Sequence, residues 1–254
     1  MYHELELPGR ALCQCDPGYV RYIVPIEDFR QQMQFIKDSG LRGLSVSEAL
    51  IPNAPAGPVF TFDDGCETDL ISAAPLLREM GFSATFYVTV GFLERRGYLT
   101  RAQLRSLSDL GLEVGSHSLT HPYLTDLSQD KLNEEISRSK QELEQITGQA
   151  VLHFSCPGGR WDERVANTAC RAGYHSVATS RSVANSSSGS LFALGRVAIM
   201  RGTNLETFAK QTKGHGLWKL RVKDSVRASV KRVFGNALYD RIRAGILANV
   251  RDKR

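Results

Sequence analysis

Short apolar runs alternate with amphipathic stretches along residues 1–212. The runs VFTF (59–62), FSATFYVTV (82–90) and LEVGSH (112–117) have the length and the β-branched or aromatic content of strands. The stretches that follow them repeat apolar residues at intervals of three and four, which is the spacing of one helix face. The pattern therefore predicts a strand followed by a helix, repeated about seven times.

Start and stop signals flank the predicted helices. Pro25 begins a helix that ends at Gly40. Ser128 can cap the longest helix, predicted over 128–147, and Gly148 ends it. Further helices are predicted at 69–81, 100–111 and 162–173, and further strands at 41–46, 151–157, 174–179 and 191–200.

This alternation is typical of the α/β class, in which parallel strands lie inside and helices lie outside. About 210 residues in this rhythm favour a deformed, incomplete (β/α) barrel of about seven strands. In that architecture, functional side chains gather at the carboxyl ends of the strands. The sequence has no internal repeat.

The charge of the chain divides it into two parts. Residues 213–254 hold 12 Lys/Arg and 3 Asp/Glu, whereas residues 1–212 hold 20 Lys/Arg and 24 Asp/Glu. Val222, Val226 and Val230 recur every four residues in the basic part, which predicts amphipathic helices. We therefore predict a domain over 1–212 and a C-terminal basic helical tail over 213–254.

Two interpretations of the tail remain open. One is a helix docked on the body with a solvated basic face, and the other is binding at an anionic membrane surface. Nucleic acid is not a predicted partner, because no aromatic residues interleave with the basic ones. Since the N-terminus MYHELELPGR has no leader pattern and no apolar run reaches membrane-spanning length, we expect a cytoplasmic protein, peripheral at the membrane in the second interpretation.

The five cysteines show no disulfide framework, which fits a reducing compartment. Cys13 and Cys15 form a C-x-C pair, and no second pair completes a zinc pattern. We interpret the cysteines as structural or incidental.

Acidic residues and histidines follow two of the predicted strands. Asp63 and Asp64 end the strand that begins with VFTF, and His117 and His121 lie in GSHSLTH at the end of another. The spacing of the histidines would place both on one side of a helical turn. Two imidazoles and a carboxylate can hold Zn²⁺, and the cation would offset the repulsion between the aspartates. The second carboxylate could then accept a proton from water.

The segments TFDDG (61–65) and HSLTH (117–121) resemble the first two motifs of the NodB-like polysaccharide deacetylases, carbohydrate esterase family 4. The similarity extends from Met1 to about Phe208. The resemblance implies a metal-dependent hydrolase of carbon–nitrogen bonds other than peptide bonds. Its substrate would be an N-acetylated sugar, oligosaccharide or lipid-linked glycan in a polysaccharide or glycoconjugate pathway.

The resemblance also implies roles for individual residues. Asp63 would be the general base, and Asp64, His117 and His121 would hold the divalent metal. Zn²⁺ is the expected metal, with Co²⁺, Ni²⁺ and Mn²⁺ as alternatives. The backbone N–H of Gly158 would stabilise the oxyanion.

The sequence departs from the family at several positions. Ser155 stands where many members carry an arginine that supports the catalytic aspartate, and Arg160 is either its replacement or a surface residue. The late histidine that serves as general acid is absent, so the acid is not identified. His3 is a candidate acid or substrate contact, and Trp161 either lines the sugar site or packs in the core. The substrate-binding candidates are His3, Pro157, Arg160 and Trp161.

These departures support two alternatives to a sugar deacetylase. One is a catalytically weak or inactive relative that binds glycans or an assembly partner. The other is a hydrolase of non-sugar amides. Metal-dependent release of acetate from acetylated sugars would distinguish a sugar deacetylase from an inactive relative. A substrate profile would distinguish a sugar deacetylase from a hydrolase of non-sugar amides.

Overall fold

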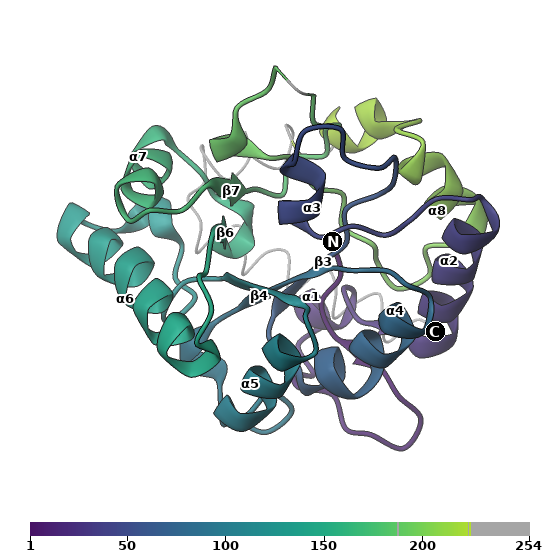
Figure 1. The fold of residues 1–254 in the computed structure, drawn as a ribbon, viewed down its shortest axis with the longest axis horizontal. Coiled ribbons are helices and arrows are strands. Elements are labelled where there is room, and N and C mark those ends of the chain that lie inside the picture. Colours follow the sequence, from purple (N-terminus) through teal and green to yellow (C-terminus); the bar gives the residue numbers. More distant parts are fainter. Residues whose placement is uncertain (187, 223, 225–254) are drawn as a thin grey trace.

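A five-stranded parallel sheet forms the centre of the molecule, with helices packed around it (Figure 1). The computed structural model describes residues 1–186, 188–222 and 224. The strand order β3–β4–β5–β6–β7 follows the chain, and every neighbouring pair is parallel, which confirms the predicted α/β class. The strands are β1 (Leu5–Glu6) and β2 (Val24–Pro25), which pair with each other, and β3 (Thr61–Asp64), β4 (Thr85–Val88), β5 (Glu113–Ser116), β6 (His153–Ser155) and β7 (Ser176–Ala178).

Both edges of this sheet are extended by segments that make single bridges. At the β3 edge, Tyr2 pairs in parallel with Phe62, and its N–H donates to the Thr61 carbonyl at 2.7 Å. At the β7 edge, Leu194 pairs in parallel with Ala178. The N-terminal residues and the segment predicted as the last strand therefore join the sheet, although neither forms a regular strand.

The two edge segments also bond to each other. The main-chain nitrogen of Met1 donates to the Val197 carbonyl at 3.0 Å, and the Ile199 N–H donates to the Met1 carbonyl at 2.9 Å. Main-chain hydrogen bonds thus run from residue 1 through the five strands and back to residue 1. The predicted deformed barrel of about seven strand segments is confirmed.

The predicted strand at 191–200 is wrong in detail. Leu191–Ala193 form a 3-10 turn, and only Leu194 makes a strand bridge. The side-chain amide of Asn185 accepts from the Gly195 N–H at 2.8 Å and donates to the Gly195 carbonyl at 3.0 Å. Because the Asn185 amide occupies the N–H and the carbonyl of Gly195, these groups cannot form strand hydrogen bonds, and regular strand pairing stops at Gly195.

Pro25 precedes α2 and Ser128 precedes α6, as the sequence predicts, although the Ser128 side chain makes no capping hydrogen bond. Gly148 ends α6 with a φ of 68°, a left-handed value suited to glycine. Thr100 and Gln103 form a capping box at the start of α5. The helices are α1 (Pro17–Val20), α2 (Ile26–Asp38), α3 (Val46–Leu50), α4 (Ala74–Glu79), α5 (Arg101–Asp109), α6 (Gln129–Thr147), α7 (Glu163–Arg171) and α8 (Leu205–Thr212).

Two predicted elements differ from the structure. The predicted strand at 41–46 reduces to a bridge between Leu44 and Val59, because Ser45 and Glu48 form a capping box that starts α3. The predicted helix at 69–81 begins with the π-helical turn Asp69–Ala73, in which the Ala74 N–H donates to the Asp69 carbonyl. Pro75 follows directly, and since it has no N–H it cannot donate to the preceding turn.

An aromatic stack fixes the orientation of β3. The rings of Tyr2 and Phe62 stack at 5.3 Å, and those of Phe62 and Phe86 stack at 4.8 Å, all fully buried under the helices. Because side chains alternate along a strand, the neighbours of Phe62 point the other way, into the barrel. Thr61 and Asp63 therefore face the interior.

The predicted tail lies largely outside the described residues, which reach it only at 213–222 and 224. Its amphipathic helices, its membrane contact and the domain boundary at residue 212 stay predictions. Before it, α8 packs on α2 through the rings of Phe208 and Phe35, whose centroids are 6.2 Å apart. None of the helices within the described ranges has the length and apolarity to cross a bilayer.

A pair of leucine substitutions tests the assignment of the core. Leu104 on α5 is fully buried, whereas Leu205 on α8 is 40% exposed. We expect Leu104→Ala to lower the free energy of unfolding by about 2–5 kcal/mol. The matched control Leu205→Ala is expected to change it by about 0.5 kcal/mol or less. Urea denaturation measures both, and equal losses would contradict the described packing of α5.

Candidate active site

Two adjacent aspartates at the end of β3 face the same site. Alternation along a strand would send them to opposite faces. Asp64 instead has a φ of 83°, which is rare outside glycine and breaks the alternation. His117 Nε2 consequently lies 3.9 Å from Asp63 Oδ2 and 3.6 Å from Asp64 Oδ1. Gly65 follows with a φ of 80°, and a Cβ there would lie 2.9 Å from the Val88 side chain, so the turn requires glycine.

The two histidines lie on the loop after β5. The predicted helical turn is wrong, because Ser118 and His121 have φ values of 69° and 67° and the segment turns through left-handed residues. The imidazoles of His117 and His121 still meet, with ring centroids 5.0 Å apart. His121 Nε2 lies 3.5 Å from Asp64 Oδ1. Ligand atoms of Asp64, His117 and His121 all lie within 4.8 Å of one another.

Glu135 of α6 holds this loop in place. Its buried carboxylate accepts hydrogen bonds from the Leu119 N–H at 3.0 Å, the Thr120 N–H at 2.9 Å and the Thr120 hydroxyl at 2.6 Å. Glu135 is not recognisable as a site residue from the sequence. A glutamate on a charged helix gives no signal that it contacts a loop earlier in the chain.

The donor set fits a divalent cation. His117 Nδ1 donates to the Ser155 carbonyl at 2.8 Å, which leaves the Nε2 lone pair directed at the carboxylates. Burial lowers the pKa of His117 to about 3, so this imidazole is neutral at pH 7. Neutral imidazoles with a carboxylate are the ligands of catalytic zinc sites.

The Asp64 carboxyl supports the same conclusion. Its Oδ1 is buried and has no hydrogen-bond partner within the described part of the chain. Burial, followed by the charge of Asp63, raises the pKa of Asp64 to about 8. An adjacent cation is the interaction that returns such a carboxyl to its ionised form.

Arg196, in the segment after β7, supplies the positive charge beside Asp63. Its Nη1 donates to Asp63 Oδ1 at 2.7 Å and its Nη2 to Oδ2 at 2.9 Å, a bidentate pair. Nη2 also donates to Ser155 Oγ at 2.7 Å, and Nε donates to the Thr179 carbonyl at 3.0 Å. Burial opposes ionisation of Asp63, but Arg196 and then His117 outweigh it and hold the pKa of Asp63 well below its usual range.

The sequence-based candidate for this cation is wrong. The guanidinium of Arg160 lies over the Tyr123 ring, 3.7 Å from its centroid. Ser155 occupies the position of the family's arginine, and its short side chain leaves room for Arg196. One signal for Arg196 was present in the sequence, since it is the single charged residue in the apolar run 191–200.

His3 lies close enough to Asp63 for that carboxylate to influence its ionisation. Its ring packs on Tyr22 with centroids 4.9 Å apart, and its Nδ1 is buried without a partner among the described residues. Burial lowers the pKa of His3 to about 4, and the Asp63 carboxylate, which acts on it most among its neighbours, opposes that shift. The structure thus places a neutral imidazole with a free nitrogen next to the site.

The predicted oxyanion donor lies on an exposed turn. Gly158 has a φ of 61° in the turn Pro157–Gly159, and a Cβ there would lie 2.9 Å from the Tyr123 ring. Tyr123 therefore occupies the space into which a side chain at position 158 would extend. The Trp161 indole N–H donates to the Phe192 carbonyl at 2.6 Å, and its ring packs against the core. These contacts favour the packing role of Trp161.

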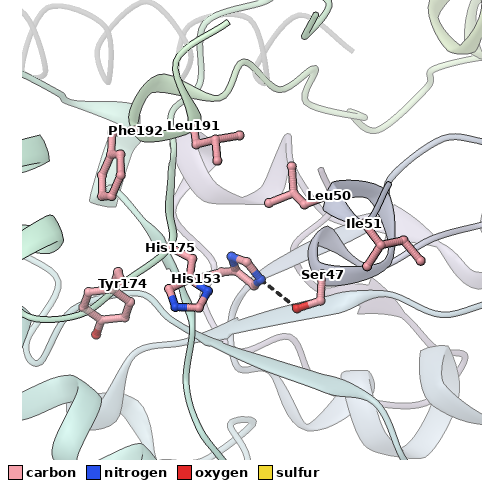
Figure 2. Close-up of a pocket in the computed structure, with 8 residues that line it drawn as sticks. All are labelled: Ser47, Leu50, Ile51, His153, Tyr174, His175, Leu191 and Phe192. Carbon is pink, nitrogen blue, oxygen red and sulfur yellow. Dashed lines mark hydrogen bonds between the residues drawn. The ribbon is translucent and has the colours of Figure 1, made fainter. Parts of the chain in front are cut away.

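A pocket of about 600 Å³ lies at the other end of the strands (Figure 2). His153 begins β6 and faces it, with Leu50 and Leu191 among the apolar residues around it. Both ring nitrogens of His153 are engaged, Nε2 with Ser47 Oγ and Nδ1 with Ser176 Oγ, each at 2.8 Å. This histidine is structural, and the pocket is separate from the cluster around Asp64.

Comparison with curated proteins finds deacetylases. Residues 55–177 match the family model described as "Polysaccharide deacetylase". The chain is 34% identical over 129 residues to the peptidoglycan-N-acetylglucosamine deacetylase of Bacillus cereus. This match covers 50% of this chain and 58% of that protein. The chain is 32% identical over 119 residues to the peptidoglycan-N-acetylmuramic acid deacetylase PdaA of Bacillus subtilis. This match covers 46% of this chain and 44% of that protein. The matches span about half of each relative.

Comparison with solved structures agrees. The Streptococcus pyogenes deacetylase PplD, in complex with acetate, superposes with a TM-score of 0.72 and 25% identity over 83% of this chain and 95% of that chain. A polysaccharide deacetylase of Bacillus cereus superposes with a TM-score of 0.71 and 26% identity over 83% of this chain and 67% of that chain. Residues 55–177 therefore form a polysaccharide deacetylase domain, in agreement with the NodB-like motifs of carbohydrate esterase family 4.

Replacing Arg196 tests the charge pair with Asp63. Arg196→Met keeps a linear side chain but leaves Asp63 buried beside Asp64 without its cation. We expect the free energy of unfolding at pH 7 to fall by about 3–5 kcal/mol, as measured by urea denaturation. Arg196→Lys keeps the positive charge but not the bidentate hydrogen bonds of a guanidinium, so its free energy of unfolding is expected to fall by less.

The pH dependence of that loss tests its cause. Because the folded pKa of Asp63 lies below its unfolded value, the pair stabilises the wild type above about pH 4, and this stabilisation is lost as the pH falls through the folded pKa. In Arg196→Met, burial instead raises the folded pKa of Asp63. The difference in stability between the two proteins should then be largest near pH 7 and shrink as the pH falls. A loss that is constant with pH would indicate altered packing and contradict the charge pair.

Proposed function

We propose that this member of the polysaccharide deacetylase family hydrolyses the N-acetyl group of an N-acetylated sugar. Asp64, His117 and His121 would hold a divalent cation, with Zn²⁺ foremost, and Asp63 would be the general base. The observation that carries the proposal is the arrangement of three ligand-type side chains within 4.8 Å of one another, next to a carboxylate whose ionised form is held by Arg196.

The substrate class is proposed from the relatives and from the accessibility of the site. The two curated relatives are named as deacetylases of peptidoglycan amino sugars. In this chain, the His117 side chain is 2% exposed but that of His121 is 31% exposed, so the site opens to solvent on the His121 side. Gly158 is exposed as well. An acetamido group on a larger glycan could reach such an open site.

The residues of the site divide the work of amide hydrolysis. Asp64, His117 and His121 would hold the cation, which when bound would supply Lewis acidity to the acetyl carbonyl and acidify the attacking water. Asp63 accepts the proton that the water loses, and its two bonds to Arg196 fix the orientation of its carboxylate. His117 is kept in the tautomer that directs Nε2 at the site by the Ser155 carbonyl.

Two further groups would complete the reaction. The Gly158 N–H, on the exposed turn after β6, would donate to the oxygen that gains negative charge. The leaving amine needs a proton when the carbon–nitrogen bond breaks. Asp63 then holds the proton taken from the water, and we propose that the neutral His3, whose Nδ1 lacks a partner within the described ranges, accepts this proton and passes it to the amine.

Arg196 bears on the alternative of an inactive relative. The family's arginine is missing at Ser155, but a guanidinium is present at the carboxylate that needs it. Arg196, from a different segment, therefore supplies the guanidinium beside Asp63, and its presence favours an active enzyme. The hydrolase of non-sugar amides differs only in substrate, and a profile of acetylated sugars against simple acetamides separates it.

Replacing Asp63, the proposed base, should abolish catalysis but leave metal binding intact. For Asp63→Asn we expect acetate release from N-acetylglucosamine oligomers to fall by about 10²–10⁴-fold, since the amide cannot accept the proton, with the metal content unchanged. His117→Ala is expected to lose both activity and metal. The matched control is Asp109→Asn, whose side chain is 61% exposed and lies on α5. Unchanged acetate release in Asp63→Asn would show that Asp63 is not the base.

Chelation tests the cation directly. We expect acetate release by the wild type to stop after treatment with a chelator and to return when Zn²⁺ or Co²⁺ is added to the dialysed protein. Release that persists in protein shown by elemental analysis to be free of metal would refute the metal-dependent proposal.

A further inference from the structure

A second cluster of ligand-type side chains lies near the active centre. A carboxylate oxygen of Glu4 and the Sγ atoms of Cys13 and Cys66 lie within 4.8 Å of one another. Ligand atoms around tetrahedral zinc are about 3.3–3.8 Å apart, given metal–ligand distances of about 2.0–2.3 Å. The three side chains would therefore need to approach one another by about 1.5 Å at most. None of them belongs to the cluster around Asp64.

Three separate parts of the chain supply these residues. Glu4 directly precedes β1, Cys66 follows β3 by two residues, and Cys13 lies between β1 and α1. Glu4 and Cys66 are buried, whereas Cys13 is partly exposed, so an ion could enter from its side. The Cys13 N–H already donates to both Glu4 oxygens, at 3.0 and 3.1 Å. The backbone thus holds the Cys13 segment against the Glu4 carboxylate.

Asp69 is an independent indication that a cation belongs here. Its side chain is fully buried, and neither carboxyl oxygen has a hydrogen-bond partner in the part of the chain that is described. Its N–H donates to the Cys66 carbonyl at 3.0 Å, which places it next to the cluster. An ionised carboxylate that is buried without a donor is unfavourable unless a cation lies beside it.

We propose that Glu4, Cys13 and Cys66 bind a second divalent cation, of the zinc type, with Asp69 beside it. Two thiolates favour a thiophilic metal ion over Mg²⁺ or Ca²⁺. On binding, each thiol releases its proton to solvent. The sequence pattern missed this site, because the partner of Cys13 is the distant Cys66 and not Cys15.

Such a cation would fasten the segment that borders the active centre. The Tyr19 hydroxyl lies 3.3 Å from Cys66 Sγ, and the Tyr22 ring packs on His3. The segment that carries Cys13 therefore continues into residues that touch both the proposed thiolate site and the proposed acid. A structural metal at Cys13 and Cys66 would hold this segment, and with it His3, in position.

Cobalt(II) titration of the reduced full-length chain tests the proposal. The Asp64 site contains no sulfur, so a thiolate-to-cobalt charge-transfer band reports the second site alone. We expect the band in the wild type and in His117→Ala. It should be lost in Cys13→Ser and in Cys66→Ser and kept in the matched control Cys15→Ser, with bound cobalt falling by about one ion per chain when the band is lost.

Glu4→Gln keeps both thiols and covers the case in which the serine variants do not fold. We expect it to retain the band with cobalt affinity weakened by about tenfold or more. The proposal is overturned by absence of the band in reduced wild type, by its survival in Cys13→Ser, or by unchanged affinity in Glu4→Gln. A Cys13–Cys66 disulfide that persists under reducing conditions would overturn it too. These readouts do not involve acetate release, so failure here is distinct from failure of the proposed function.

Discussion

Two buried carboxylates at the end of one strand require positive charge, and the rest of the site follows from how that charge is supplied. Asp63 receives it from the chain, through two hydrogen bonds with Arg196. Asp64 does not, since its Oδ1 is buried without a partner in the described residues and its pKa is raised to about 8. The pair is therefore unequal. One carboxylate is fixed as an anion, and the other lies beside two neutral imidazoles, where the proposed cation would bind.

Closure of the barrel makes this division possible. Arg196 belongs to the last segment and the aspartates to β3, which are far apart in the chain (Figure 1). They meet because residues 1–3 lie between them, bonded to Thr61 on one side and to Val197 and Ile199 on the other. Arg196 Nη1 also reaches the Thr61 hydroxyl at 3.2 Å. The charge pair and the closing hydrogen bonds thus stabilise the same junction, and neither is expected to form without the other.

The sequence predicted what depends on local chemistry. Strand and helix alternation, the cap at Gly148 and the strand-end positions of Asp63 and His117 are all readable from neighbouring residues. What it missed depends on tertiary contact or on backbone conformation. Arg196 meets Asp63 across 133 positions of the chain. The positive φ of Asp64 reverses the alternation on which strand patterns rely, and the loop after His117 bends through left-handed residues where the spacing favours a helical turn.

Ser155 joins the two halves of the site. Its carbonyl accepts from Nδ1 of His117, the proposed metal ligand, and sets the tautomer of that ring, while its hydroxyl accepts from the guanidinium that holds Asp63, the proposed base. A larger residue at this position would occupy the space that Arg196 uses. The arrangement has a chemical consequence, because a bidentate guanidinium that fixes the Asp63 carboxylate also weakens it as a base. In the mechanism that we propose, deacetylation at neutral pH would then depend more on acidification of the water by the cation than on the proton affinity of the aspartate.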